Sequence, residues 1–192
     1  MTAAWDTYID NHKNYIRSYG EGEGSPNRET LFKYIPEGSC VLDVGMGPGC
    51  NYGHAKLINR KIAYTGIDYS MKFVEACREL FPEGCFFQGD ARKLAFPDKC
   101  FDIVILQDVL EYTGGYEVAI EEAIRVAIHR VIICLWVPLT QGPTQICEVV
   151  DGINGSSYNE SEFLAFLRGH CDLLTLDEEH RNRNHWYYIL EL

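Results

Sequence analysis

Short apolar runs alternate with amphipathic segments along the first two-thirds of the chain. The apolar runs predict buried strands over residues 39–44, 62–67, 84–88, 101–106 and 130–137. The segments between them that have helical spacing are 51–60, 70–80 and 116–126. Strands that alternate with helices favour a parallel sheet covered on both faces, which explains why these runs contain so few polar residues. The pattern therefore predicts an α/β fold.

The two ends of the chain add further elements. At the C-terminal end, 160–167 reads as a helix, and 172–176 and 186–190 alternate like a terminal pair of strands. At the N-terminal end, 5–19 reads as an amphipathic helix with Tyr8, His12, Tyr15 and Tyr19 on one face. This helix either packs on the domain or acts as a lid on a glycine-rich linker. We expect one domain over residues 1–192, with the lid helix and linker in 1–26 and the core in 27–192.

Composition narrows the classes of partner. The chain has 192 residues and a net charge of -11, with no basic run, so we expect no nucleic-acid partner. The longest apolar run, 131–137, is too short to cross a membrane. The eight cysteines form no C-x-x-C pair and no secretory signal precedes them, which favours free thiols in the cytoplasm. The acidic balance suits a small neutral or cationic substrate, and the oligomeric state is expected to be a monomer or homodimer.

A glycine-rich turn follows the first predicted strand. The segment Val41-Leu42-Asp43-Val44-Gly45-Met46-Gly47-Pro48-Gly49 ends an apolar run with glycines at every second position. Glycine permits positive φ and lets a ligand approach the backbone closely, and such a turn at the carboxyl end of a strand lines the ligand crevice of an open α/β sheet. A dinucleotide site needs G-x-G-x-x-G, whereas the third glycine here comes one residue early.

Asp68 ends the second predicted strand. A carboxylate at this position can accept hydrogen bonds from both hydroxyls of a ribose, and such charge-assisted bonds are strong. NAD and S-adenosylmethionine both contain that ribose, so Asp68 does not distinguish these cofactors.

Together these motifs resemble the class I S-adenosylmethionine-dependent methyltransferases of the small-molecule type. The resemblance covers about residues 39–137 and implies a Rossmann-like, seven-stranded, mostly parallel sheet with a C-terminal antiparallel hairpin. It implies that Asp90 accepts from the adenine amino group, that the Ala91 amide meets a ring nitrogen and that Tyr69 covers the adenine. Asp43 would act through its charge, and the backbone at Gln107 would face the methionine moiety. The cofactor-binding residues implied are Asp43, Gly45, Gly47, Gly49, Asp68, Tyr69, Asp90, Ala91 and Gln107.

The exit of the fourth strand should carry the methyl-transfer site. The run Gln107-Asp108-Val109-Leu110-Glu111-Tyr112 resembles the family pattern Leu-Glu-His, with tyrosine in place of histidine. Asp108 and Glu111 are the catalytic candidates, although Glu111 and Tyr112 equally suit packing roles. A base is needed only for a protonated acceptor, and His54, His129 and His185 are the other candidates. No histidine or cysteine group has metal-ligand spacing, so no metal is expected.

The sequence therefore favours methyl transfer from S-adenosylmethionine to a small molecule by in-line displacement, with S-adenosylhomocysteine as product. Substrate choice is expected in the N-terminal helix, the loop after Asp108 and a long polar loop over 138–158, with Trp136 and Tyr158 as possible pocket residues. Two alternatives stay open. One is a non-catalytic, cofactor-binding or scaffold member of the same fold, and the other is an NAD-dependent oxidoreductase.

Overall fold

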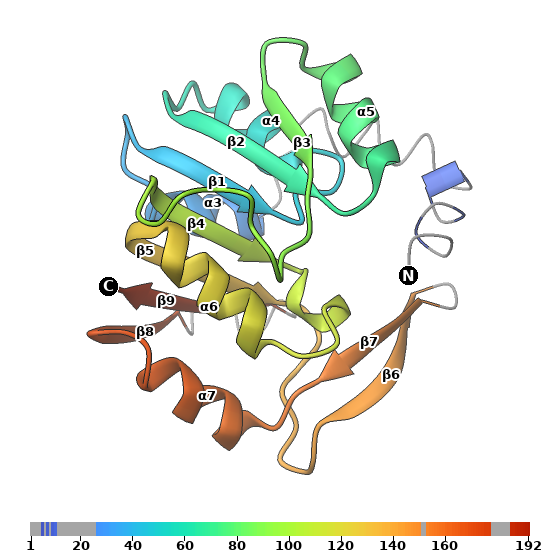
Figure 1. The fold of residues 1–192 in the computed structure, drawn as a ribbon, viewed down its shortest axis with the longest axis vertical. Coiled ribbons are helices and arrows are strands. Elements are labelled where there is room, and N and C mark those ends of the chain that lie inside the picture. The colour runs from blue at the N-terminus through green and yellow to red at the C-terminus, as the bar shows by residue number, and fades with distance from the viewer. Residues whose placement is uncertain (1–4, 6, 8, 11–25, 151–152, 178–184) are drawn as a thin grey trace.

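The computed structural model describes the chain apart from residues 1–4, 6, 8, 11–25, 151–152 and 178–184. Its main sheet has seven strands in the order β3-β2-β1-β4-β5-β9-β8 (Figure 1). Adjacent strands among β1 to β5 are parallel, whereas β9 is antiparallel to both β5 and β8. This confirms the predicted mostly parallel sheet with a C-terminal antiparallel pair. The strands are β1 (Cys40–Val44), β2 (Ala63–Asp68), β3 (Cys85–Gln88), β4 (Phe101–Gln107), β5 (Ala127–Leu135), β8 (Leu173–Asp177) and β9 (Trp186–Glu191).

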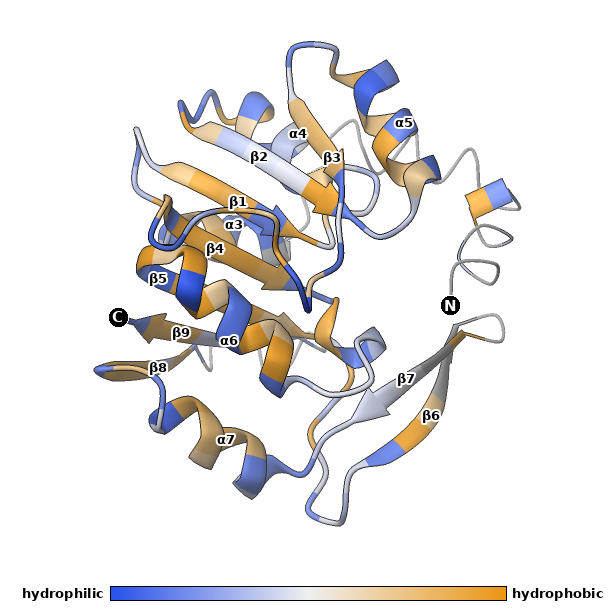
Figure 2. Ribbon diagram, viewed as in Figure 1, coloured by the Kyte–Doolittle hydropathy of each residue, from blue (hydrophilic) through white to orange (hydrophobic). Residues whose placement is uncertain are grey.

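Helices cover both faces of the sheet because successive strand residues point to opposite sides. Val41 packs with Leu31 and Ala55 on one face, whereas Leu42 packs with Ile120 and Phe163 on the other. Figure 2 shows the apolar residues concentrated on the strands and on the inner sides of the helices. The helices are α3 (Pro26–Lys33), α4 (Cys50–Leu57), α5 (Met71–Leu80), α6 (Glu117–Val126), α7 (Glu160–Arg168) and the 3-10 helix η1 (Leu110–Tyr112).

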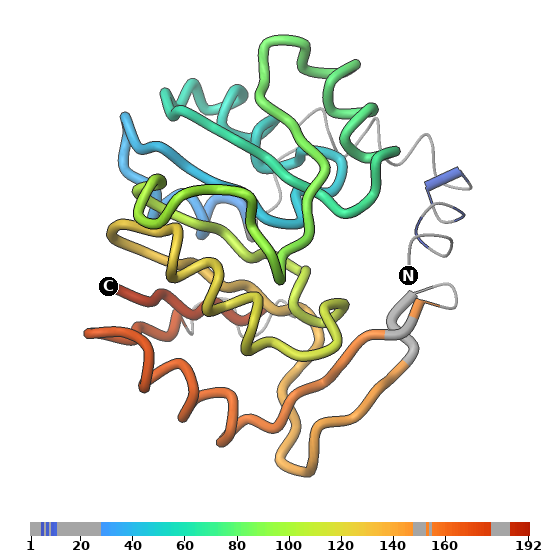
Figure 3. The backbone as a smooth tube through the Cα atoms, in the orientation of Figure 1, coloured from blue at the N-terminus to red at the C-terminus, as the bar shows by residue number. Residues whose placement is uncertain are grey.

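The strand order creates a switch point between β1 and β4. The chain runs outward from β1 through β2 to β3 and then returns to β4 on the other side of β1 (Figure 3). The connections leaving β1 and β4 therefore diverge to opposite sides, which opens a crevice at the carboxyl ends of these strands. The glycine turn follows β1 and the run from Gln107 to Tyr112 follows β4, so both predicted site segments meet there.

Two sequence-based expectations need correction. Strand β5 ends at Leu135 rather than Val137, because the backbone amides of Trp136 and Val137 donate to the Glu111 carboxylate. The predicted long loop over 138–158 contains a separate antiparallel hairpin, formed by β6 (Gln145–Val150) and β7 (Ile153–Ser157) (Figure 1).

Several predictions about the N-terminal segment lie outside the described residues. Tyr8, His12, Tyr15 and Tyr19 belong to this group, as does the glycine-rich linker. Trp5, Thr7, Ile9 and Asp10 are described and helical.

In the described parts of the chain, no helix combines the length and the apolar character that a membrane crossing needs. All eight cysteines are free thiols, as predicted.

Candidate functional site

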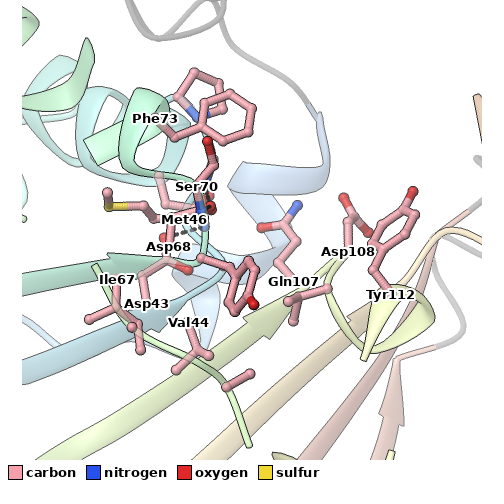
Figure 4. Close-up of a pocket in the computed structure, with 18 of the residues that line it drawn as sticks. Asp43, Val44, Met46, Ile67, Asp68, Ser70, Phe73, Gln107, Asp108 and Tyr112 are labelled. Carbon is pink, nitrogen blue, oxygen red and sulfur yellow. Dashed lines mark hydrogen bonds between the residues drawn. The ribbon is translucent and has the colours of Figure 1, made fainter. Parts of the chain in front are cut away.

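One cavity of about 590 Å³ lies across the carboxyl ends of β1, β2 and β4. The glycine turn and Asp68 line one part of its wall, and the residues after β4 line another. Figure 4 shows Asp43, Asp68, Gln107 and Asp108 around this common space. Of the predicted cofactor residues, all but Gly49 line the cavity. A volume of this size is ordinary for a site that holds a cofactor or other small ligand.

The glycine turn needs its glycines for two different reasons. Gly45, Gly47 and Gly49 all have positive φ, at 74°, 54° and 77°. A Cβ on Gly45 would come within 2.5 Å of Val109, whereas a Cβ on Gly47 would meet nothing within 4 Å. Gly49 caps α4, where a Cβ would lie 3.0 Å from the Cys77 sulfur. Gly45 and Gly49 therefore allow close packing, and Gly47 leaves the cavity open.

Asp43 is buried at the end of β1 and belongs to a small polar network. Its Oδ2 accepts hydrogen bonds from the Tyr64 hydroxyl at 2.5 Å and from Asn51 Nδ2 at 3.0 Å. Burial raises the pKa of Asp43 to about 6, although these two hydrogen bonds act in the opposite direction. A cation in the cavity would favour its ionised form.

Asp68 connects β2 to the glycine turn. Its Oδ2 accepts from the Gly47 amide at 3.0 Å, and its Oδ1 accepts from the Ser70 amide at 2.8 Å. Burial raises the pKa of Asp68 to about 6, against the effect of these backbone donors. Tyr69 follows with its side chain about half exposed at the cavity wall. Each carboxylate oxygen has a second lone pair, so the side chain can still accept from a ligand.

Asp90 lies at the cavity with an ion-pair partner of its own. Its two oxygens accept from Arg92 Nε at 3.0 Å and from Arg92 Nη2 at 2.8 Å. Arg92 thereby holds the pKa of Asp90 below its usual range. Ala91 also lines the cavity. The arginine was not anticipated from the sequence, and it leaves Asp90 fewer free lone pairs for an adenine amino group.

The cavity wall near the end of β4 contains Asp108 and His185. Asp108 has a φ of 54°, which is uncommon outside glycine, and its amide donates to the Cys134 carbonyl at 2.9 Å. Nε2 of His185 lies 3.5 Å from Asp108 Oδ2. His185 lines the cavity, whereas His54 is buried outside it and His129 lies near the amino ends of the strands. Only His185 among these three base candidates is therefore placed at the cavity.

Glu111 lies behind the cavity wall rather than in it. It is buried, and its Oε1 accepts from the amides of Trp136 at 3.0 Å and Val137 at 3.3 Å. Burial, reinforced by the charge of Asp108, raises the pKa of Glu111 to about 8. Tyr158 is likewise a core residue whose hydroxyl donates to the Leu110 carbonyl, so it does not form the predicted pocket wall. Trp136 does line the cavity, as predicted.

Several lining residues were not identified from the sequence. Trp5 packs edge-on against Tyr112, with ring centroids 5.0 Å apart, and lies 6.4 Å from Phe73. Arg28, from α3, is buried in the wall near Asp43. No local motif marks these residues, because they reach the cavity only through the packing of α3 and α5 and through the contacts of Trp5 with Phe73 and Tyr112.

Solved structures with the same architecture show the fold of the chain. A chain from the Haloferax volcanii complex between the Trm112 methyltransferase activator and a methyltransferase has a TM-score of 0.72 at 16% identity, covering 99% of this chain and 96% of that one. A protein from Pyrococcus horikoshii has a TM-score of 0.68 at 19% identity, covering 93% and 98%. These likenesses, with the observed strand order, define a Rossmann-like methyltransferase fold.

The sequence comparison agrees with the fold. Residues 42–135, just under half of the chain, match the family described as a methyltransferase domain. This match confirms the resemblance to the class I S-adenosylmethionine-dependent methyltransferases. Phosphatidylethanolamine N-methyltransferase of Cereibacter sphaeroides is 34% identical over 58% of this chain and 57% of its own length. Fatty-acid O-methyltransferase of Mycolicibacterium smegmatis is 35% identical over 47% and 34%. The matches span little more than half of the first relative and about a third of the second. The cofactor of this family is S-adenosylmethionine.

Proposed function

We propose that the chain transfers a methyl group from S-adenosylmethionine to a small-molecule acceptor by in-line displacement. The observation that carries this proposal is the shared cavity, which the glycine turn and Asp68 line together with Asp108, Trp136 and His185. The sulfonium is already a good leaving group, so the protein has to align the acceptor with the methyl group and exclude water. Alignment of this kind can supply most of the acceleration.

The cofactor would lie along the carboxyl ends of β1 and β2. Asp68 would accept from the ribose hydroxyls, while Asp90, Ala91 and Tyr69 would surround the adenine. Gly45 and Gly47 would let the backbone approach the ligand, and Asp43 would contribute negative charge near the sulfonium and amino groups. Gln107 would face the methionine moiety, since its Oε1 is buried and has no hydrogen-bond partner among the described residues.

Arg28 places a cationic group at the end of the cavity near Asp43. Its side chain is buried in the cavity wall, close enough to Asp43 and Cys50 to affect their pKa values. The cofactor has a carboxylate at its methionine end, and an arginine can bind a carboxylate with two parallel hydrogen bonds. We therefore assign Arg28 to the carboxylate of the cofactor.

The acceptor would occupy the part of the cavity near Asp108. Trp5, Tyr112 and Trp136 give this part an aromatic wall, and Asp108 and His185 supply groups that can take a proton. Glu111 would act as a positioning residue, because its carboxylate fixes the backbone that presents Trp136. By their names, the two relatives above act on phosphatidylethanolamine and on fatty acids, which supports a small-molecule acceptor rather than a nucleic acid. The net charge of -11 agrees with this.

The N-terminal segment would complete the cavity as a lid on a single domain. Trp5 supports this assignment, because it lines the cavity and packs against Tyr112, far away in the sequence. We propose residues 1–26 as lid and linker and 27–192 as the core of one domain, which acts as a monomer or homodimer. Size-exclusion chromatography with light scattering measures the oligomeric state.

Calorimetric titration with S-adenosylmethionine, S-adenosylhomocysteine and NAD, run in parallel, tests the cofactor. We expect the two sulfur compounds to bind and NAD not to bind. Binding of NAD alone would favour an oxidoreductase and overturn the proposal. Screening of small-molecule acceptors for release of S-adenosylhomocysteine then tests catalysis. Cofactor binding without turnover on any acceptor class would favour the non-catalytic alternative.

A further inference from the structure

We propose that Asp108, Cys134 and His185 form a binding site for a zinc-like divalent cation at the acceptor end of the cavity. These residues offer a carboxylate oxygen, a thiol sulfur and an imidazole nitrogen, and the three atoms lie within 4.8 Å of one another. Carboxylate, thiolate and imidazole are the three side-chain ligands that zinc uses in proteins.

The topology of the sheet brings these residues together. β4, β5 and β9 are neighbours, Asp108 directly follows β4, Cys134 lies near the end of β5, and His185 directly precedes the antiparallel β9. The Asp108 amide donates to the Cys134 carbonyl at 2.9 Å, and the pairing of Leu135 with Trp186 places His185 at the same edge. Three neighbouring strand ends therefore position these groups at one edge of the sheet.

The distance between Asp108 and His185 suits a shared cation better than a direct contact. Nε2 and Oδ2 are 3.5 Å apart, which is longer than an ordinary hydrogen bond. Two ligands that each lie about 2.0–2.1 Å from a tetrahedral zinc are roughly 3.4 Å apart. In addition, Oδ1 of Asp108 is buried, and apart from the Cys134 thiol, which is a weak donor, the described residues offer it no hydrogen-bond partner. A buried acceptor in that state is stabilised by a cation.

The three groups are arranged around the cavity wall so that one side of the site is open. Asp108 and His185 line the cavity, whereas Cys134 is fully buried behind them. A cation between them would have three protein ligands, and its fourth position would face the cavity. Three ligands and an open position are the pattern of catalytic zinc sites, whereas structural sites have four protein ligands.

The ligand types also select among metals. A thiolate with an imidazole favours zinc over magnesium or calcium, which prefer oxygen ligands. Cys134 would bind the metal as its thiolate, so metal binding would release one proton to solvent.

This site would define the acceptor class, a consequence that rests on the proposed methyltransferase function. A thiol or hydroxyl acceptor would replace the water at the open position and lose its proton to solvent. The zinc-bound thiolate or alkoxide would then donate an electron pair to the methyl carbon. The bond between that carbon and the cofactor sulfur breaks, and the pair returns to the sulfur, which leaves neutral S-adenosylhomocysteine and a thioether or ether.

Metal analysis of the purified full chain tests the site itself. The protein is equilibrated with zinc, desalted and analysed for zinc per chain. Cobalt is then used in place of zinc, because a thiolate ligand gives a charge-transfer band that carboxylates and imidazoles do not give. We expect one metal per chain in the wild type, with the thiolate band, and no stoichiometric metal in His185→Gln or Asp108→Asn. In Cys134→Ser the thiolate band should be absent, even if the variant still binds cobalt.

Matched controls separate this site from adventitious metal and from misfolding. Cys85→Ser removes an exposed thiol and His170→Gln removes a histidine from outside the cavity, and both should retain one zinc. Binding of S-adenosylhomocysteine in a calorimetric titration confirms that each variant is folded. If the wild type itself did not bind this compound, the result would contradict the proposed function but not the metal site. A wild type without stoichiometric zinc, or zinc that persists in His185→Gln and Asp108→Asn, would overturn the inference.

Discussion

The amide of Gly47 donates a 3.0 Å hydrogen bond to the Oδ2 atom of Asp68, and this bond joins the glycine turn after β1 to the end of β2. The other oxygen of the same carboxylate accepts from the Ser70 amide at the start of α5. One side chain thus fixes the shape of the turn and also faces the cavity. Asp68 therefore has a structural role in addition to the ribose-binding role proposed for it.

Replacement of Asp68 by alanine should weaken cofactor binding strongly. The variant loses the proposed ribose acceptor and releases the Gly47 amide, and hydrogen bonds to a charged group contribute about 1.5–3 kcal/mol each. We expect the dissociation constant for S-adenosylhomocysteine in calorimetry to rise by about 10- to 100-fold. Glu79→Ala removes an exposed carboxylate from α5 and is the matched control. Equal affinities for the two variants would rule out the role assigned to Asp68.

Alanine at Gly45 and at Gly47 should have different effects. Both positions have positive φ, which costs an alanine about 1–2 kcal/mol. At Gly45 the new Cβ would also meet Val109 at 2.5 Å. Such overpacking costs about 1–3 kcal/mol more. At Gly47 the Cβ would enter open space at the cavity.

We therefore expect Gly45→Ala to lower the free energy of unfolding by about 2–5 kcal/mol in urea titrations. Gly47→Ala should lower it by only about 1–2 kcal/mol but should weaken cofactor binding more than its stability loss explains. If Gly47→Ala bound the cofactor as tightly as the wild type, the backbone of that residue would not be in contact with the ligand.

Most of the sheet could be predicted from the sequence because its central strands are buried on both faces. The apolar runs around Val41 and Ile103 are typical of strands that are covered on both faces of a parallel sheet. The hairpin of β6 and β7 was missed for the opposite reason. Its second strand, Ile153-Asn154-Gly155-Ser156-Ser157, has neither alternation nor an apolar run, and it forms through pairing with β6.

The cofactor side of the cavity was predictable because its residues directly follow strands. Asp68 and Asp90 reach the cavity through strand order alone. Arg28 was not predictable as a wall residue, and His185 was only one of three histidine candidates, because their positions depend on how α3 packs on the sheet and on where β9 joins it. The proximity of Asp108, Cys134 and His185 likewise depends on the adjacency of β4, β5 and β9, which sequence spacing does not reveal.

Cofactor affinity should increase as the pH rises through about 6. The folded, cofactor-free protein holds a proton on Asp43 up to that pH, whereas an unfolded carboxyl loses its proton near 3.8. Between these values the unfolded chain binds fewer protons, so the free energy of unfolding falls as the pH rises. A cofactor with net positive charge prefers the ionised carboxylate, so its binding is expected to strengthen over the same range.

Calorimetric titration with the cofactor from about pH 5 to about pH 7.5 measures the pH dependence of its affinity. Asp43→Asn cannot ionise but can still accept from Tyr64, so it should bind the cofactor more weakly and with a smaller pH dependence. Asp68 has a similarly raised pKa, so part of the dependence should persist in that variant. If the pH dependence of affinity in Asp43→Asn equalled that of the wild type, cofactor binding would not change the protonation of Asp43.

Substitutions of Glu111 should separate a positioning role from a catalytic one. Burial raises its pKa to about 8 from the ordinary 4.5, so the folded protein holds this proton at neutral pH. The unfolded chain loses the proton first, and the free energy of unfolding should therefore fall as the pH rises from about 4.5 to 8. Glu111→Gln should remove this slope while its amide oxygen still accepts from Trp136 and Val137. Glu111→Ala should remove the acceptor and leave two backbone amides without a partner.

We expect Glu111→Ala to lose about 2–6 kcal/mol of stability, because each of the two amide donors left unpaired costs roughly 1–3 kcal/mol. Glu111→Gln should be at least as stable as the wild type at pH 7 and should retain methyl transfer. Urea titrations at several pH values measure the first effect, and release of S-adenosylhomocysteine with a working acceptor measures the second. A loss of turnover by about 100-fold or more in Glu111→Gln, without a loss of stability at pH 7, would instead assign Glu111 to proton transfer.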